Sequence, residues 1–424
     1  MARTFNPQDA HVIINAVAKE LTGQQPTIQA VDSSSFVSVG ELIMEHEAES
    51  VLKAISTVIG RTMAAARPYE AKLHLITAMN SGVFSNRFRK LSFYARESQA
   101  AGNFNTQLFN ENLKNGATNI GTDYATKDQW EQNQPQVLEM NFGGSSVWQD
   151  STTRYEEQLQ EAFVDEASFM AFVGGIMIEK ANDLETQKEA FNRINLSNYM
   201  AGLYDLREKM PGSAINLTTE YNKKNGTQYT SAELRTTYLK DFLEFFVYRF
   251  NLESKRMAIR SSRYHWTPDR PGYALLRHTP LAKQRVLLYE PLILESKTKV
   301  LPEIFHEGAL DLSQYESMLF WQNFTEGETS KLSYTPAIPD TNGSGAQKKG
   351  TPVALEYVVG LLYDEDALMT DFQLANVRTT PIEARKGYSN IWWSFKQNAI
   401  NDFTENGILF YMDDSALPAL AKKK

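Results

Sequence analysis

Residues 165–203 read DEASFMAFVGGIMIEKANDLETQKEAFNRINLSNYMAGL. Apolar residues spaced seven positions apart form a stripe that starts just before this stretch and runs through it: Phe163, Met170, Met177, Leu184 and Phe191. Further apolar residues fill the shorter steps and widen the stripe into a face that we expect to be buried: Ala167, Val173, Ala181 and Ile194. Asp165 is a suitable N-cap. The pattern predicts one helix from Asp165 to Leu203, roughly 50 to 60 Å long.

A helix of this length is typical of a membrane span, a coiled coil or the spine of a large, flat subunit. Charged residues within the apolar run exclude a membrane span: Glu179, Lys180, Asp183 and Glu185. A coiled coil is disfavoured because Gly174-Gly175 interrupts the helix and because Lys188 and Asn195 fall on the stripe. The remaining interpretation is a spine against which a sheet packs.

Composition limits the class of protein. The chain has 424 residues, of which 42% are hydrophobic and 22% charged, so it can bury a sizeable core. Its formal charge of −8 disfavours tight wrapping of nucleic acid by the whole chain. The absence of cysteine excludes disulfides, thiolate metal sites and cysteine nucleophiles. The N-terminus lacks the shape of a signal peptide, and no run of about 18 apolar residues follows, so we expect a cytosolic protein without a membrane partner.

The first half contains helices and one long polar region. Residues 8–22 are predicted to form an amphipathic helix, and after a break at the serines of 33–35 a second helix is expected over Gly40–Ala66. From Ser81 to Thr153 the chain is polar, except for aromatic and aliphatic residues that can bury against a neighbour: Trp130, Phe142, Val147 and Trp148. A disordered loop and an extended hairpin that docks on another molecule fit this region equally well.

The second half is richer in strands. Thr230 and Glu233 form a capping box that opens a helix over about Ala232–Arg260. Strands are expected where apolar residues follow turn residues: Arg285–Leu294, Leu355–Tyr363, Ile391–Phe395 and Gly407–Met412. Helices in the first half followed by strands in the second predict an α+β fold. We expect Tyr388–Trp393 and Gly407–Met412 to complete the sheet beside the spine.

No constellation of residues predicts an active site, a metal site or a cofactor site. The acidic runs Asp364-Glu365-Asp366 and Asp413-Asp414 lack the ligand spacing of a calcium loop. Four basic residues gather near the end of the predicted helix: Lys255, Arg256, Arg260 and Arg263. They suit the helix dipole, and they equally suit contact with nucleic acid or with an acidic neighbour.

Three segments near the C-terminus carry a resemblance to a known family. Residues 358–369 read VVGLLYDEDALM, residues 380–395 read TPIEARKGYSNIWWSF, and residues 401–410 read NDFTENGILF. In this order they resemble the C-terminal signature of tailed-bacteriophage major capsid proteins of the Hong Kong 97 type, most of all those of small, short-tailed, picovirus-like podoviruses.

The resemblance implies an α+β Hong Kong 97-type capsid fold. It divides the chain into an N-terminal arm, an extended hairpin loop region, a spine helix in a peripheral domain, an axial domain with return strands, and C-terminal strands that complete both sheets: 1–80, 81–160, 161–205, 206–352 and 353–424.

The implied function is that of a major capsid protein, a structural protein and not an enzyme. Such subunits self-assemble as pentamers and hexamers into the icosahedral head that encloses the double-stranded DNA genome. The implied partners are other copies of the chain, a scaffolding protein, a portal, and packaged DNA held without sequence specificity. The implied location is the virion capsid, assembled in the cytoplasm of the host bacterium.

Two alternatives remain open. A nanocompartment shell of the encapsulin type has the same fold and encloses cargo enzymes. A carbohydrate-active enzyme would agree with the 11% aromatic content and the many acidic residues. It requires two carboxylates facing each other across a sugar-binding cleft, and no spacing in the sequence nominates such a pair.

Overall fold

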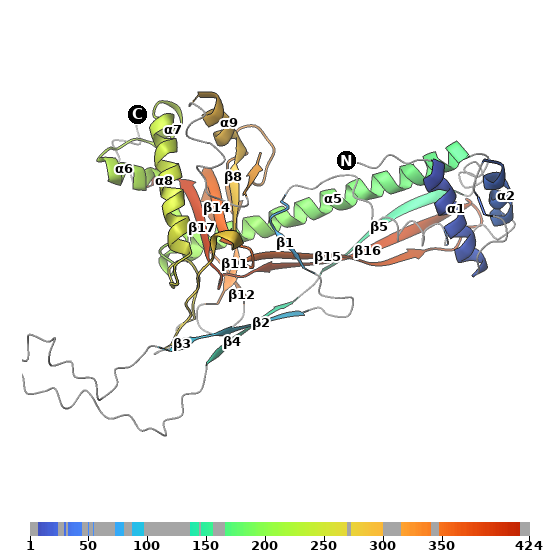
Figure 1. The fold of residues 1–424 in the computed structure, drawn as a ribbon, viewed down its shortest axis with the longest axis horizontal. Helices are drawn as coiled ribbons and strands as arrows, with labels where there is room; N and C mark the ends of the chain where they lie inside the picture. The colour runs from blue at the N-terminus through green and yellow to red at the C-terminus, as the bar shows by residue number, and fades with distance from the viewer. Residues whose placement is uncertain are drawn as a thin grey trace, which may run out of the picture.

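The computed structural model describes residues 7–23, 29–30, 33–44, 50, 54, 73–79, 87–96, 136–143, 146–155, 166–268, 273–299, 315–340 and 347–415. Within these residues the two largest sheets, of four and five strands, follow each other along one long helix (Figure 1). The mixture of helices and sheets confirms the predicted α+β class.

The long helix is α5, 40 residues from Glu166 to Asp205. Its ends lie within two residues of the predicted ones, and its backbone stays helical through Gly174 and Gly175. A short 3-10 turn, η3 (Leu206–Glu208), follows it. No helix in the described part of the chain has the length and apolarity needed to cross a membrane.

The N-terminal part of α5 lies along a four-stranded sheet, and together they form what we call the elongated lobe (Figure 1). The strand order is β1 (Thr77–Met79), β15 (Leu368–Thr379), β16 (Tyr388–Asn401) and β5 (Ser146–Tyr155). Only the β1–β15 pair is parallel among the described strands of this sheet. The buried side chains of Ile391, Trp393 and Phe395 form a small cluster against which Leu184 of α5 packs. Among the described side chains of this lobe, this buried cluster is small.

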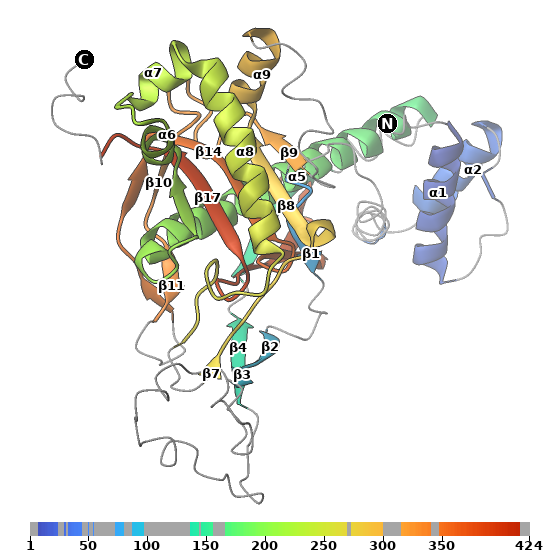
Figure 2. The same cartoon turned by 60° about the vertical axis from the view of Figure 1, so that its left-hand side comes forward.

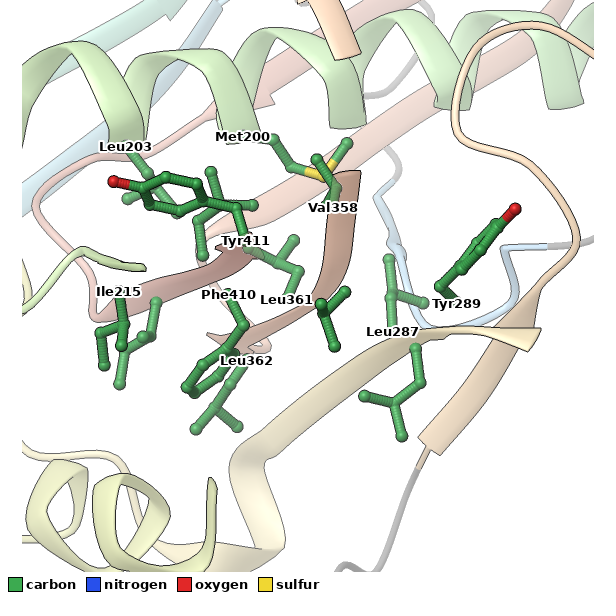
Figure 3. Packing of buried hydrophobic residues seen from close by; sticks show 14 of the residues in the cluster. Met200, Leu203, Ile215, Leu287, Tyr289, Val358, Leu361, Leu362, Phe410 and Tyr411 are labelled. Carbon is green, nitrogen blue, oxygen red and sulfur yellow. The ribbon is translucent and has the colours of Figure 1, made fainter. Parts of the chain in front are cut away.

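The compact lobe is built on a five-stranded sheet. Its strand order is β6 (Ala214–Asn216), β17 (Gly407–Met412), β14 (Tyr357–Asp364), β8 (Gln284–Tyr289) and β9 (Tyr315–Met318). All six residues of β17 are buried, as expected for a strand covered on both faces. Phe250 lies against Phe410 on one face with 5.2 Å between ring centroids, and Tyr204 of α5 lies against Tyr411 on the other at 5.3 Å. The sheet is thus sandwiched between α8 and the C-terminal part of α5 (Figures 2 and 3).

Four helices complete the compact lobe: α6 (Leu217–Asn225), α7 (Ser231–Thr236), α8 (Leu239–Met257) and α9 (Glu290–Lys299). The predicted capping box is present, since Thr230 accepts from the backbone N–H of Glu233 while the Glu233 carboxylate accepts from that of Thr230. The helix expected over Ala232–Arg260 is divided, because Tyr238 leaves the helical conformation between α7 and α8.

The remaining elements are short. Helices α1 (Pro7–Thr22) and α2 (Ser33–Met44) contact each other and α5. Three small antiparallel pairs and one 3-10 turn join the compact lobe or extend from it: β3 (Ala95–Arg96) with β7 (Tyr273–Ala274), β10 (Leu332–Tyr334) with β13 (Val353–Leu355), β11 (Ala337–Pro339) with β12 (Gln347–Lys349), and η4 (Leu281–Lys283). A fourth pair, β2 (Arg87–Phe93) with β4 (Val137–Gly143), forms the ribbon treated below.

Several expectations were wrong in detail. Gly407–Met412 is a strand with the predicted bounds, and both it and Tyr388–Trp393 lie beside the spine, but they belong to two different sheets and not to one. The second helix begins at Ser33 and not at Gly40, so the serines of 33–35 form its first turn. The strand expected over Arg285–Leu294 is β8, which begins at Gln284 and ends at Tyr289, and α9 follows with a proline in its first turn.

Candidate assembly surfaces

The β2–β4 ribbon lies apart from both sheets in Figures 1 and 2. Its residues alternate between two faces, which we call inner and outer. Lys90 and Ser92 point inward, where Ser92 is buried. Leu91 and Phe93 point outward. The inner face combines Lys90 and Ser92 with half-buried apolar residues such as Phe88 and Phe142, while the outer face exposes Leu91 and Phe93 beside the charged Arg89. Both faces are therefore mixed in polarity, and the outer face leaves apolar side chains in contact with solvent.

The inner face is anchored by charge. The ammonium of Lys90 donates to the carboxylate of Asp402 and, at 2.5 Å, to that of Glu405. Arg277 donates to the Ser92 hydroxyl at 2.6 Å and forms an ion pair with Glu405 at 3.2 Å. Asp402 is fully buried, and its other oxygen accepts from the N–H and hydroxyl of Thr404. Because Asp402 and Glu405 lie in the loop between β16 and β17, the ribbon is fixed where the two lobes join.

The pKa values of the anchor follow from its burial. Burial disfavours the charged form of Lys90, but the carboxylates of Asp402 and Glu405 outweigh it and hold the pKa of Lys90 above its ordinary value. Burial raises the pKa of the Glu405 carboxyl, against the lowering effect of Lys90 and Arg277. The ammonium of Lys90 therefore stays charged throughout the physiological pH range.

The outer face carries an apolar strip. Phe93 is 67% exposed, and its cross-strand partner Val137 is exposed as well. Leu91 lies beside them, next to an exposed ion pair between Arg89 and Glu139 at 2.9 Å. A strip of apolar side chains on a fixed strand pair, bordered by charges, has the composition of a protein-binding surface.

The sequence-predicted contact residues are distributed over two elements. Trp130 lies outside the described residues. Phe142 is half-buried on the inner face of the ribbon, opposite Phe88. Val147 and Trp148 are 63% and 57% exposed on β5, the strand that ends the described four-stranded sheet. Because Val147 and Trp148 are adjacent on one strand, their side chains point to opposite faces of the sheet, and each face carries one exposed apolar residue apart from the ribbon.

The structure describes the side chains of only part of the predicted stripe of α5. Phe163 and the side chains of Met170 and Met177 lie outside the described residues. Leu184 and Phe191 are both half-buried.

One stripe residue, Ile194, was predicted to be buried and is 55% exposed. A seven-residue repeat drifts by about 20° per repeat around a straight helix, so the buried face moves away from it. In the C-terminal turns the buried side chains are Leu196, Tyr199, Met200 and Leu203.

The predicted basic patch lies at the end of α8 and in the turn after it. Lys255, Arg256, Arg260 and Arg263 are all exposed. Arg256 forms an ion pair with the buried Glu253 at 2.9 Å. Ile259, among these residues, is 66% exposed, a neighbour that sequence reasoning did not single out.

The residues of the two acidic runs form hydrogen bonds and ion pairs within the chain. Asp364 is buried and accepts from the Thr279 hydroxyl at 2.6 Å, while Glu365 pairs with Arg285 at 2.6 Å and with Lys283 at 2.8 Å. Asp414 accepts from the backbone N–H of Ser231 at 2.7 Å. Within the described residues, no group of three or more acidic or histidine side chains is arranged to hold a metal ion.

Sequence reasoning missed the outer face of the ribbon. Residues 87–93 read RFRKLSF, in which both alternating sets contain apolar and polar residues, so the pattern does not show which set faces solvent. The positions of Asp402 and Glu405, more than 300 residues later, show that the set with Lys90 faces the protein.

Comparison with known proteins gave structural likenesses only. No model of a known protein family matches the chain, and no curated protein matches it. The chain is similar to one in the capsid structure of Staphylococcus phage Andhra, with 12% identity and a TM-score of 0.48 over 81% of this chain and 84% of the other. It is also similar to a chain in the structure of the head fiber and inner core protein of native bacteriophage P68, with 12% identity and a TM-score of 0.45 over 79% and 83%. A third likeness is to the mature capsid of bacteriophage PhiM1, with 10% identity and a TM-score of 0.40 over 82% and 89%.

Proposed function

We propose that this chain is the major capsid protein of a tailed bacteriophage, which self-assembles as pentamers and hexamers into an icosahedral head around double-stranded DNA. The observation that carries the proposal is the ribbon: its inner face is fixed by Lys90 and Arg277, and its outer face presents Leu91, Phe93 and Val137 to solvent. The C-terminal sequence signature of the Hong Kong 97 type supports the same function.

Assembly accounts for an apolar strip that the monomer leaves exposed to solvent. Exposed apolar side chains on a soluble monomer favour association, and a closed shell covers every copy of the strip by repeating one contact. The Lys90 anchor holds the strip in place before contact, so little conformational entropy is lost when a neighbour docks. Val147 and Trp148, on opposite faces of β5, are two further exposed apolar residues, which we assign to the same class of contact.

The segments of the chain take the following roles in this proposal. Residues 1–80 form the arm, 81–160 the extended loop with the ribbon, 161–205 the spine, 206–352 the axial domain and 353–424 the strands that complete both sheets. A scaffolding protein and a portal are the further partners. DNA is packaged without sequence specificity, and the net charge of −8 suits an inner wall that holds DNA loosely, since affinity for phosphates grows with the number of basic contacts.

Electron microscopy tests the proposal. The wild-type chain is expressed alone and with the scaffolding protein of the same phage, and particles are separated by sedimentation and imaged. Uniform closed shells are expected, and double-stranded DNA in native particles identifies a phage head. Shells that contain cargo enzymes in place of DNA would identify a nanocompartment. A chain that remains monomeric under all these conditions contradicts both.

The variant Phe93→Ser tests the role of the ribbon. We expect a monomer that is folded like the wild type, because Phe93 is exposed, and a several-fold lower yield of shells. Circular dichroism of the monomer and the sedimented shell fraction measure the two. Leu281→Ser, which changes an exposed leucine on η4, is the matched control and should assemble normally. Normal assembly of Phe93→Ser would contradict the proposed contact.

A further inference from the structure

The loop that follows β9, residues 319–331, presents an aromatic side chain on a fixed base. Phe324 is 73% exposed and lies edge-on against Phe320, with ring centroids 5.2 Å apart. The guanidinium of Arg193 stacks on the other ring of this pair, 3.7 Å from the centroid of Phe320, and donates to its carbonyl at 2.7 Å. Glu189 holds that guanidinium with a carboxylate oxygen 2.5 Å away. Phe324 is therefore supported from below by α5.

The rest of the loop is equally well fixed. Trp321 is fully buried, and its indole N–H donates to the carbonyl of Val358 at 3.0 Å. Its backbone N–H donates to the carbonyl of Thr329 at 3.0 Å, which closes the loop at its base. At the tip, Glu326 and Glu328 are exposed on either side of Gly327. The loop is a rigid knob that carries one exposed aromatic ring and two carboxylates.

A surface of opposite charge lies in the turn after α8. Ile259 is 66% exposed and is surrounded by the basic patch formed by Lys255, Arg256, Arg260 and Arg263. The turn is fixed by two backbone hydrogen bonds between Ser261 and Arg277, at 2.9 and 3.0 Å, and by one from Gly212 to the carbonyl of Arg263 at 3.2 Å. This basic turn thus offers an apolar centre with a positively charged rim.

The knob and the basic turn lie at opposite ends of the five-stranded sheet. The knob follows Met318, which pairs with Tyr289 at the C-terminal end of β8. The end of α8 lies at the other end of β8, where Ser254 contacts Gln284 at 2.5 Å. At about 3.3 Å per residue, the six residues of β8 separate the two by more than roughly 15 Å. The two surfaces of one chain are thus too far apart to meet each other.

We propose that the knob of one copy docks on the basic turn of the next copy. Phe324 then packs against Ile259, and Glu326 and Glu328 face the arginines of the neighbour. Two different surfaces at opposite ends of one lobe make a head-to-tail contact, which closes into a ring when the rotation between copies is suitable. Rigid surfaces with complementary charge favour this partner over a nucleic acid, which the carboxylates of the knob would repel. The contact rests on the proposed function, because it would join subunits within a pentamer or hexamer.

Charge reversal tests the contact. Glu326→Arg and Arg260→Glu change exposed side chains at the two surfaces. Each single variant places like charges together, and we expect the protein concentration needed for assembly to rise about tenfold. The double variant restores opposite charges and should assemble within about threefold of the wild type. An equal mixture of the two single variants should also assemble better than either alone. Lys223→Glu, on the exposed side of α6, is the matched control and should have no effect.

The outcomes distinguish a failure of this contact from a failure of the proposed function. Single variants that form shells like the wild type overturn the contact and leave the capsid proposal intact. If the assembly defects of the two single variants add in the double variant, the proposed contact is also overturned. A wild-type chain that stays monomeric at every concentration overturns both proposals. Phe324→Ala, which changes no charge, should weaken assembly while the circular dichroism of the monomer stays unchanged, which shows that the defects do not arise from misfolding.

Discussion

The two lobes share one helix but differ in how their sheets are covered. In the compact lobe, α8 and α5 cover both faces of the five-stranded sheet, and the buried side chains form one continuous core around Phe410 (Figure 3). This core also includes Phe246 and Phe250. In the elongated lobe, the buried cluster on the four-stranded sheet consists of Ile391, Trp393 and Phe395. The exposed Val147 and Trp148 also lie on this sheet.

The difference indicates which parts of the chain stabilise the monomer and which parts take part in assembly. A sheet buried on both faces removes enough apolar surface from water to stabilise a lobe on its own. A sheet whose described side chains bury a small cluster and leave apolar residues exposed can gain further burial from neighbours. We infer that the compact lobe stabilises the monomer, while the elongated lobe and the ribbon become fully stable in the shell.

The largest expected effect is a difference in unfolding free energy between substitutions in the cores of the two lobes. Phe410→Ala removes a fully buried ring that packs against Phe246 and Phe250, and should lower the free energy of unfolding of the monomer by about 3–5 kcal/mol. Phe395→Ala, in the small cluster of the elongated lobe, should cost clearly less, because its half-buried neighbours can collapse into the space. Denaturant unfolding followed by circular dichroism measures both. Equal losses would contradict the distinction between the lobes.

The next effect concerns the joint between the lobes. Lys90→Met leaves the buried Asp402 without its cation, and should cost about 2–3 kcal/mol, below the usual value for a broken buried pair because Thr404 still donates to Asp402. Arg89→Met, one residue away, removes an exposed ion pair and should cost at most about 1 kcal/mol. If the two variants were equally stable in urea, the ribbon would not be anchored as described.

The smallest effect is a pH dependence at the turn from β14 to β15. Burial raises the pKa of the Asp364 carboxyl, although the hydrogen bond from Thr279 acts in the opposite direction. The folded state therefore binds a proton more tightly than the unfolded state, so this stabilisation is present below the ordinary pKa of about 4 and is lost as pH rises through the folded-state pKa. In Asp364→Asn the decline of unfolding free energy above about pH 4 should be shallower. An unchanged slope would contradict the assignment to Asp364.

Local signals in the sequence predicted several elements well. The apolar stripe predicted α5 to within two residues, and β17 begins at the predicted residue, Gly407. The capping box at Thr230 and Glu233 was also correct, because its hydrogen bonds join residues three apart. These features depend on periodicity and on short-range chemistry, which a sequence displays directly.

Long-range pairing was not predictable in the same way. Nothing local shows that β5 pairs with β16, more than 200 residues later, or that β17 leaves the sheet of β16 for the compact lobe. In the ribbon, Lys90 faces the protein while Leu91 and Phe93 face solvent, and the mixed alternation of the strand does not show this orientation. The partner of Lys90 is an acidic loop from the far end of the chain.

A cryo-electron microscopy reconstruction of the particles that this chain forms tests the proposed assembly through the ribbon most directly. The account predicts a closed icosahedral shell in which Leu91, Phe93 and Val137 lie against a neighbouring copy, while the core around Phe410 is the same as in the monomer. Particles without a closed shell, or a shell in which the outer face of the ribbon remains in contact with solvent, would contradict it.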